Sequence, residues 1–160
     1  EAGELLKIEI KNPADGSTVA SGTYANWIPG AHYTFVMYNN YDVRQTTLLC
    51  DSAQMPAAGK FKLRLMHFSP EVPAIDVLFN NDTLARNLVY YGTDSTQAVN
   101  PILEIPATTY TVKVLAHSTG AVLFSVPGMG IADNRILDMY AMGTMSNPSM
   151  SPFSLGGAAH

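Results

Sequence analysis

Residues 61–79 read FKLRLMHFSPEVPAIDVLF, and this stretch decides the fold. Its first part alternates apolar and charged residues, namely Phe61, Lys62, Leu63, Arg64 and Leu65. That period of two is typical of a strand with one buried face. The pattern stops around Pro70 and Pro73 and resumes at residues 75–79. Because proline donates no backbone hydrogen bond and fixes its own φ, we predict two strands joined by a stiff corner.

The rest of the chain repeats short β-like runs separated by Gly, Pro and Asn turns. No window of a dozen residues carries the apolar stripe of a helix. Outside residues 61–79, the expected strands are residues 5–11, 17–23, 31–38, 43–50, 83–88, 99–105, 110–114, 121–126 and 135–142. This pattern predicts an all-β fold, an immunoglobulin-like antiparallel β-sandwich. Residues 144–160 are rich in Ser, Pro and Gly, and we expect them to be irregular or to form an extended edge.

An internal similarity relates the two ends of the chain. Residues 8–35 align with residues 112–139 without a gap, with Gly16 on Gly120. Both stretches read as strand, Gly turn, strand, Pro/Gly loop and strand, although few residues are identical. We interpret residues 59–143 as a complete sandwich and residues 1–58 as a partial repeat that lacks its opening strands. Chance similarity of two hairpins is the alternative.

A partial sandwich has a physical consequence for assembly. It leaves an apolar face and open strand edges, which favour pairing with another chain. Residues 144–160 could fill the gap, the partial repeat could pack on the complete domain, or a second copy could supply a strand. The last alternative predicts a homo-oligomer formed through an open sheet edge.

Composition and charge exclude some classes of function. The net charge is −4, and the nine basic residues are scattered, so we expect no nucleic-acid partner. No apolar run reaches the roughly 18 to 20 residues that a membrane span needs, so we expect a protein that does not span a membrane. Cys50 is the single cysteine and cannot form an internal disulfide. Its apolar neighbours predict a small buried residue rather than a reactive thiol.

The proline corner carries the polar residues that could do chemistry. We predict a structural motif made of His67, Ser69, Pro70, Pro73 and Asp76, in which a His67–Asp76 hydrogen bond and a Ser69 cap hold the two strands at a fixed angle. A metal-dependent enzyme that uses the histidine and the aspartate is the weaker alternative. Metal sites need three or four converging ligands, and the other histidines show no ligand spacing to this one. We therefore expect no metal and no cofactor.

Catalytic signatures are missing from the sequence. It has no Gly-x-Ser-x-Gly elbow, no phosphate-binding loop and no dinucleotide fingerprint. A glycosidase pair of acids stays open, although nothing indicates that Glu71 and Glu104 are buried together. We predict that the protein is not an enzyme and has no catalytic residues.

Aromatic residues near turns suggest one candidate binding surface. A platform for sugar could be built from Trp27, Tyr90 and Tyr91, together with Tyr24, Tyr38 and Tyr41. The alternative is that these rings pack in the core or at its rim.

Residues 67–77, HFSPEVPAIDV, resemble a bacterial domain family of unknown function whose members carry a His-x-Ser-Pro-x-x-Pro-x-x-Asp-Val motif. The likeness extends from about Lys60 to Gly143. This sequence departs from the family pattern at residues 80–82, at Thr108 and at residues 131–134. The resemblance implies small β-sandwiches, often in tandem, on secreted proteins and lipoproteins of the cell envelope. It implies an extracytoplasmic location, in the periplasm, on the outer membrane surface or secreted, with a lipid anchor upstream as one variant. It implies no known activity.

Taken together, these observations predict a non-catalytic cell-envelope module with a structural or binding role, such as adhesion or scaffolding. Its partner would be a protein or a glycan at the cell surface. The alternative is a carbohydrate-binding domain of a larger secreted or surface protein.

Overall fold

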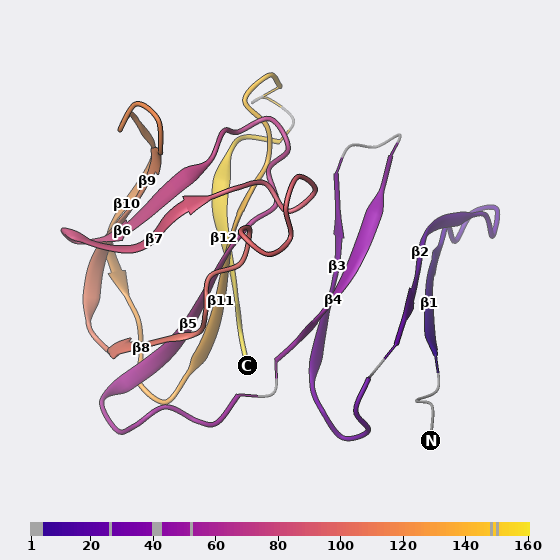
Figure 1. Ribbon diagram of the computed structural model, residues 1–160, viewed down its shortest axis with the longest axis horizontal. Coiled ribbons are helices and arrows are strands. Elements are labelled where there is room, and N and C mark those ends of the chain that lie inside the picture. The colour runs from indigo at the N-terminus through magenta and orange to yellow at the C-terminus, as the bar shows by residue number, and fades with distance from the viewer. Residues whose placement is uncertain (1–4, 26, 40–42, 52, 148, 150) are drawn as a thin grey trace. The chain divides into compact units, whose positions relative to one another are not determined.

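The computed structural model describes residues 5–25, 27–39, 43–51, 53–147, 149 and 151–160. Every regular element in these ranges is a β-strand, which confirms the predicted all-β class (Figure 1). Contacts divide the chain into two units, Glu1–Ala53 and Gln54–His160. This division falls before the boundary expected at residue 58, and it places the tail in the second unit. None of the described elements is a helix of the length and apolarity needed to cross a bilayer.

The second unit is a sandwich of two four-stranded sheets. Its strands are β5 (Lys60–His67), β6 (Ile75–Phe79), β7 (Asp82–Leu88), β8 (Leu103–Pro106), β9 (Thr109–Ala116), β10 (Val122–Gly130), β11 (Ile136–Met142) and β12 (Ser154–Ala159). One sheet has the order β12-β11-β5-β8 and the other β10-β9-β6-β7. The sandwich prediction is therefore confirmed. One pair differs from the antiparallel arrangement expected, because β5 runs parallel to β11.

Residues 61–79 supply most of the core of this unit. The inward side chains of β5 and β6 are 0–1% exposed, and they are Phe61, Leu63, Leu65, Ile75, Val77 and Phe79. They pack in one cluster with Val112 and Val114 of β9 and with Met139 and Ala141 of β11. The corner between β5 and β6 passes from one sheet to the other. A single stretch therefore contributes apolar side chains to both layers.

A second corner is fixed by a tyrosine. The Tyr110 hydroxyl donates a hydrogen bond of 2.6 Å to the carbonyl oxygen of Pro106, four residues upstream. The ring packs edge-on against Phe61 and Phe79, at centroid distances of 6.3 and 5.1 Å. Burial, and then the charge of Asp82, raise the pKa of Tyr110, so the phenol stays protonated and keeps donating. This is the tyrosine-corner arrangement known from sandwich proteins.

Part of the Ser/Pro/Gly-rich tail forms an ordered edge. β12 pairs antiparallel with β11 along its whole length. Gly143, which follows β11, has φ +88°, and a Cβ there would lie 2.2 Å from the carbonyl oxygen of Pro152. Only glycine fits this close approach, which brings the two arms of the β11–β12 connection together. Of the two alternatives expected for residues 144–160, an extended edge describes residues 154–159, and irregular chain does not.

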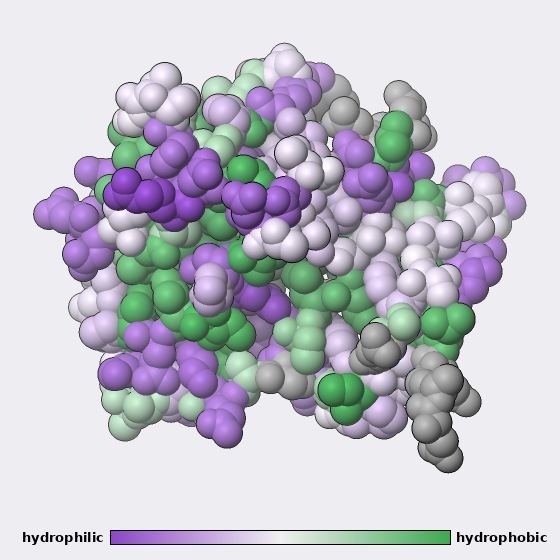
Figure 2. All heavy atoms as spheres, viewed as in Figure 1, coloured by the Kyte–Doolittle hydropathy of each residue, from purple (hydrophilic) through white to green (hydrophobic). Residues whose placement is uncertain are grey.

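The first unit contains two hairpins. They are β1 (Leu6–Lys11) with β2 (Thr18–Tyr24), and β3 (Tyr33–Tyr38) with β4 (Gln45–Cys50). The Thr46 hydroxyl of β4 donates to the Ser21 carbonyl of β2 at 3.1 Å, and the rings of Tyr24 and Phe35 meet edge to face at 6.2 Å. Large apolar side chains remain exposed here, and green atoms are visible on this unit at the right of Figure 2.

These two hairpins repeat the last two hairpins of the second unit in strand register. The matched cross-strand pairs are Ile8–Gly22 with Val112–Val126, and Tyr33–Cys50 with Leu137–Ala159. The turn glycines also match, because Gly16 has φ +71° and Gly120 has φ +69°. β1 to β4 are thus counterparts of β9 to β12. Within its described residues, the first unit has no counterpart of β5 to β8.

Candidate functional site

His67 lies at the end of β5, fully buried beside the proline corner. Its Nε2 is 3.2 Å from the Pro73 carbonyl oxygen, and its Nδ1 is 3.3 Å from the backbone N–H of Ser69. These partners fit a neutral ring that donates through Nε2 and accepts through Nδ1. Burial lowers the pKa of His67, and hydrogen bonds to the carbonyls of Pro73 and Val72 offset only part of that effect. The neutral imidazole therefore joins the two ends of the corner, through Pro73 on one side and Ser69 on the other.

Ser69 is also fully buried, and its hydroxyl is already engaged. The Oγ donates a hydrogen bond of 2.7 Å to the carbonyl oxygen of Gly143. The backbone N–H of Phe68 donates to the Ala141 carbonyl at 2.8 Å, so two neighbouring bonds attach the corner to the end of β11. This role differs from the predicted cap, because the serine holds a different strand rather than its own corner. A buried hydroxyl bonded in this way is not presented to a substrate.

The predicted His67–Asp76 hydrogen bond was wrong. Asp76 lies on the opposite face of β6 from the core residues, where its Oδ1 accepts from the backbone N–H of Asn87 at 2.8 Å. The same oxygen is 2.7 Å from Nδ1 of His117, at the end of β9. The correction follows from strand alternation, because an inward histidine and an outward aspartate point to different sides of the sandwich.

The His117–Asp76 pair is the most enzyme-like feature of this unit. Burial alone would raise the pKa of Asp76, but the hydrogen bonds from Asn87 and His117, with the charges of His117 and Arg86, lower it below its usual value. A carboxylate that orients an imidazole is one part of a nucleophilic site. No Ser, Thr or Cys side chain in the described ranges bonds to His117. The geometry instead ties the start of β6 to the β9–β10 turn.

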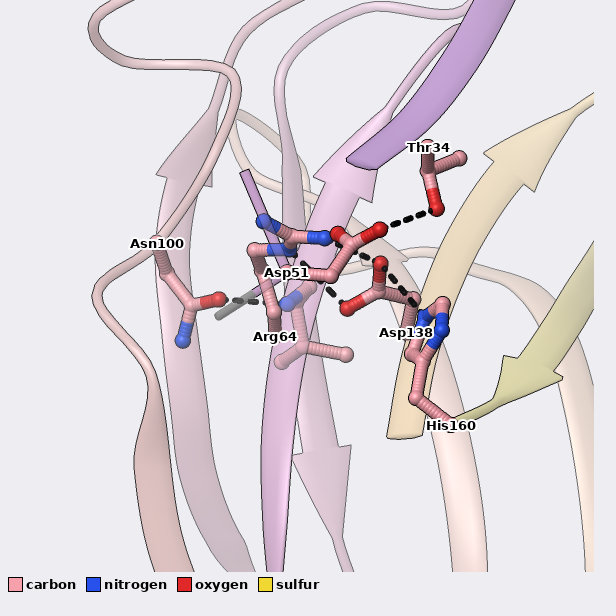
Figure 3. Close-up of polar contacts among 7 residues, drawn as sticks. Thr34, Asp51, Arg64, Asn100, Asp138 and His160 are labelled. Carbon is pink, nitrogen blue, oxygen red and sulfur yellow. Dashed lines mark hydrogen bonds and ion pairs between the residues drawn. The ribbon is translucent and has the colours of Figure 1, made fainter. Parts of the chain in front are cut away.

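A buried ion pair lies on the outer face of the β5 sheet (Figure 3). Arg64 and Asp138 stand opposite one another in the parallel β5–β11 pairing, and their side chains are 8% and 3% exposed. The guanidinium donates through Nε to Oδ1 at 2.9 Å and through a second nitrogen to Oδ2. His160 Nε2 lies 3.4 Å from the same Oδ2. This forked geometry locks the register of two strands that are far apart in the sequence.

Sequence reasoning missed this pair. Asp138 is the one charge in an otherwise apolar strand, but Arg64 alternates with apolar residues in β5 as Lys62 does, so nothing marked it as a partner. Nothing in the sequence indicated that β5 lies beside β11, because the pattern sets no strand order and the expected sandwich was antiparallel.

The predicted aromatic candidates fall in different units. Trp27 lines a cavity of about 390 Å³ in the first unit, with Tyr24 and Tyr33 among its walls. The Ile28 backbone N–H donates to the Tyr33 hydroxyl at 2.8 Å, which fixes the Trp27 loop against β3. Tyr38 is in β3, and Tyr41 lies outside the described residues.

The other two candidates pack on the proline corner. The Tyr90 ring meets His67 at 6.4 Å and covers Gly92, where a Cβ would lie 2.4 Å from the ring. The Tyr91 ring packs on Phe68 at 5.0 Å. Both rings pack against residues of the proline corner. This contact corresponds to the alternative to a sugar platform, in which the rings pack at the rim of the core.

A second cavity, of about 350 Å³, lies between β7 and residues 96–103. Its walls include Arg86, Asn87 and Asn100. Neither this cavity nor the one beside Trp27 is lined by a histidine, aspartate or glutamate. The corner residues and the two cavities are therefore separate features.

Comparison with known proteins gives a family. A family model described as "Domain of unknown function (DUF4397)" matches residues 2–78 and residues 63–155. The two overlapping matches together cover nearly the whole chain. A search of curated proteins gave no match.

Acidification is expected to destabilise the protein through His67. The folded pKa of this group is below the unfolded value of about 6.5, so the unfolded chain takes up the proton first. The associated stability is complete above about pH 6.5 and is lost as pH falls toward the folded pKa. His67→Gln should cost stability at pH 7.5, and its deficit against wild type should narrow by pH 5 in urea unfolding. Parallel stability curves for the two proteins would contradict the assignment.

The Arg64–Asp138 pair should behave as a coupled unit. Arg64→Met or Asp138→Leu alone removes one charge of the forked pair and leaves the other one buried, and each should cost about 3–5 kcal/mol. The double variant should recover most of that loss, because both charges of the pair are removed together. A control pair, Lys60→Met with Glu104→Leu, removes an exposed bridge and should change unfolding free energy by less than about 1 kcal/mol. Additive effects at Arg64 and Asp138 would rule out the coupling.

Proposed function

This chain belongs to the DUF4397 family, described as a domain of unknown function, and we propose that it is a non-catalytic β-sandwich module of the bacterial cell envelope. Its role is structural or binding, as in adhesion or scaffolding, and it works outside the cytoplasm. The location rests on the resemblance of residues 67–77 to domains of secreted proteins and lipoproteins.

One observation carries the non-catalytic part of the proposal. Each polar residue of the motif is used to hold the backbone of the sandwich. His67 bridges its own corner, and Ser69 bonds the segment after β11. Asp76 bonds the end of β7 and the β9–β10 connection. A catalytic site keeps its nucleophile and base converging on an open pocket. Here the motif residues point to three different places, and neither described cavity contains them.

A turnover screen tests this proposal. The 160-residue chain should give no activity above buffer against esterase, peptidase, phosphatase and glycosidase substrates between pH 5 and pH 9. Turnover that disappears in Asp76→Asn, while the variant keeps its far-UV circular dichroism, would contradict the proposal. That variant conserves shape and removes the charge that orients His117, so it addresses the most enzyme-like pair.

The cavity beside Trp27 favours a second candidate, carbohydrate binding. Its size and aromatic walls are those of small-ligand sites, and none of its lining residues is charged. It would therefore take a neutral sugar.

A glycan array tests this candidate. Binding to neutral oligosaccharides should be lost in Trp27→Ala and kept in Tyr91→Ala, which changes an aromatic ring in the other unit. A blank array, or equal loss in both variants, would count against the sugar site.

A further inference from the structure

The cavity between β7 and residues 96–103 lies at one side of the second unit. β7 is an edge strand of one sheet, and β8 is an edge strand of the other. The volume of about 350 Å³ is within the range of small-ligand sites. Apolar atoms are visible in Figure 2 between the places that β7 and β8 take in Figure 1. Every lining residue belongs to the second unit, so the cavity is formed within that unit alone.

Apolar residues make up more than half of the lining of this cavity. They are Leu84, Ala85, Leu88, Val99, Pro101 and Leu103. Leu88 is buried, and Leu84 packs against the core of the sandwich, so this wall is held in place by the core. Burial of apolar surface favours a ligand whose body is apolar.

Asn100 is fixed in the wall by two hydrogen bonds to Leu65 of β5. Its backbone N–H donates to the Leu65 carbonyl oxygen at 3.0 Å, and its Oδ1 accepts from the Leu65 N–H at 2.5 Å. Because a backbone N–H needs an acceptor, the side-chain oxygen must face β5 and the amide nitrogen must point away from it, as Figure 3 shows. That nitrogen is buried and has no hydrogen-bond partner among the described residues. Leaving such a donor unpaired is unfavourable, so this wall suits a ligand that presents an acceptor oxygen.

Arg86 is the one charged residue that lines the cavity, whose walls all lie in the described part of the chain. Its side chain is exposed rather than packed in the core. A planar guanidinium presents two parallel donors that match the two oxygens of a carboxylate. A cavity with one cation and no acidic residue in its walls attracts an anionic group and disfavours a cationic one.

Two carboxylates near the cavity are already bonded within the protein. Asp94 accepts hydrogen bonds from Thr96 and Gln97, which also fixes the wall that faces β7. Asp76 interacts with the positive charge at the end of β7, but its Oδ1 is bonded to His117 at 2.7 Å. Neither carboxylate belongs to the lining, so neither takes the place of a ligand anion.

We propose that this cavity binds a small ligand with an apolar body and a carboxylate group. The carboxylate pairs with the Arg86 guanidinium and accepts from the Asn100 amide, and the body lies against Leu84, Leu88 and Leu103. A free acid and the carboxyl end of a peptide share this chemistry. The inference does not depend on the sugar site, because the Trp27 cavity belongs to the first unit.

Titrations of the full chain followed in amide NMR spectra test the site. The probes are isocaproate, a branched free acid, and N-acetyl-leucine, which imitates the carboxyl end of a peptide. Both acids should shift the backbone amides of residues 86–88 and the side-chain amide of Asn100 in a saturable way. Isocaproamide has the shape of the free acid without its charge, and it should bind at least about tenfold more weakly.

Two variants test the polar contacts. Arg86→Gln should weaken the binding of both acids about tenfold, because it removes the charged partner of the carboxylate. Its matched control is Arg135→Gln, at an exposed arginine outside the cavity, which should leave the affinity within about twofold. Asn100→Asp keeps an oxygen for the Leu65 N–H and replaces the amide donor with a second oxygen, so it should abolish binding. If that variant does not fold, the two arginine variants still decide the test.

Three results would overturn the proposal. The first is the absence of a saturable shift with either acid at about 10 mM. The second is equal binding of isocaproamide, which would remove the role of the charge. The third is an equal loss in Arg86→Gln and Arg135→Gln, which would indicate attraction to the overall surface charge. Where the acids bind as proposed, tighter binding of isocaproate supports a free acid as the ligand, and tighter binding of N-acetyl-leucine supports a peptide end.

Discussion

The structure depends on one apolar stretch that is buried from both sides. The strands on either side of the proline corner belong to different sheets, and the side chains that face inward from both of them are only 0–1% exposed. Removing apolar surface from water is the main favourable term in folding. Because the corner is short and stiff, the two layers are held in contact by the chain itself. Tyr110 touches aromatic rings from both strands and joins the same core.

The polar residues of the corner follow from this burial. A chain that turns between two layers leaves backbone carbonyls and N–H groups inside, and each needs a partner. His67 and Ser69 satisfy such groups of the corner and of the neighbouring connection. A neutral histidine is well suited, because it donates and accepts on opposite sides of one ring. The contacts of His67 and Ser69 are therefore explained by the backbone groups that the corner buries.

Much of the fold could be predicted from the sequence. Alternation located most of the strands, and the similarity of residues 8–35 to residues 112–139 anticipated a shared strand register. The partners of individual side chains could not be predicted. The parallel β5–β11 pairing joins segments about seventy residues apart, so neither the Arg64–Asp138 pair nor the contact of Ser69 with Gly143 had a local signal. Asp76 was assigned to the wrong histidine, because nearness in sequence favoured His67 over His117.

Amide hydrogen exchange of the native protein tests the central claim most directly. Exchange is slowest where opening a hydrogen bond requires the core to unfold. The account predicts that the amides of Leu65 and Val77 exchange at the global unfolding limit, whereas that of Ile8 in β1 exchanges much faster. Exchange at Leu65 and Val77 as fast as at Ile8 would contradict a molecule built on the β5–β6 corner.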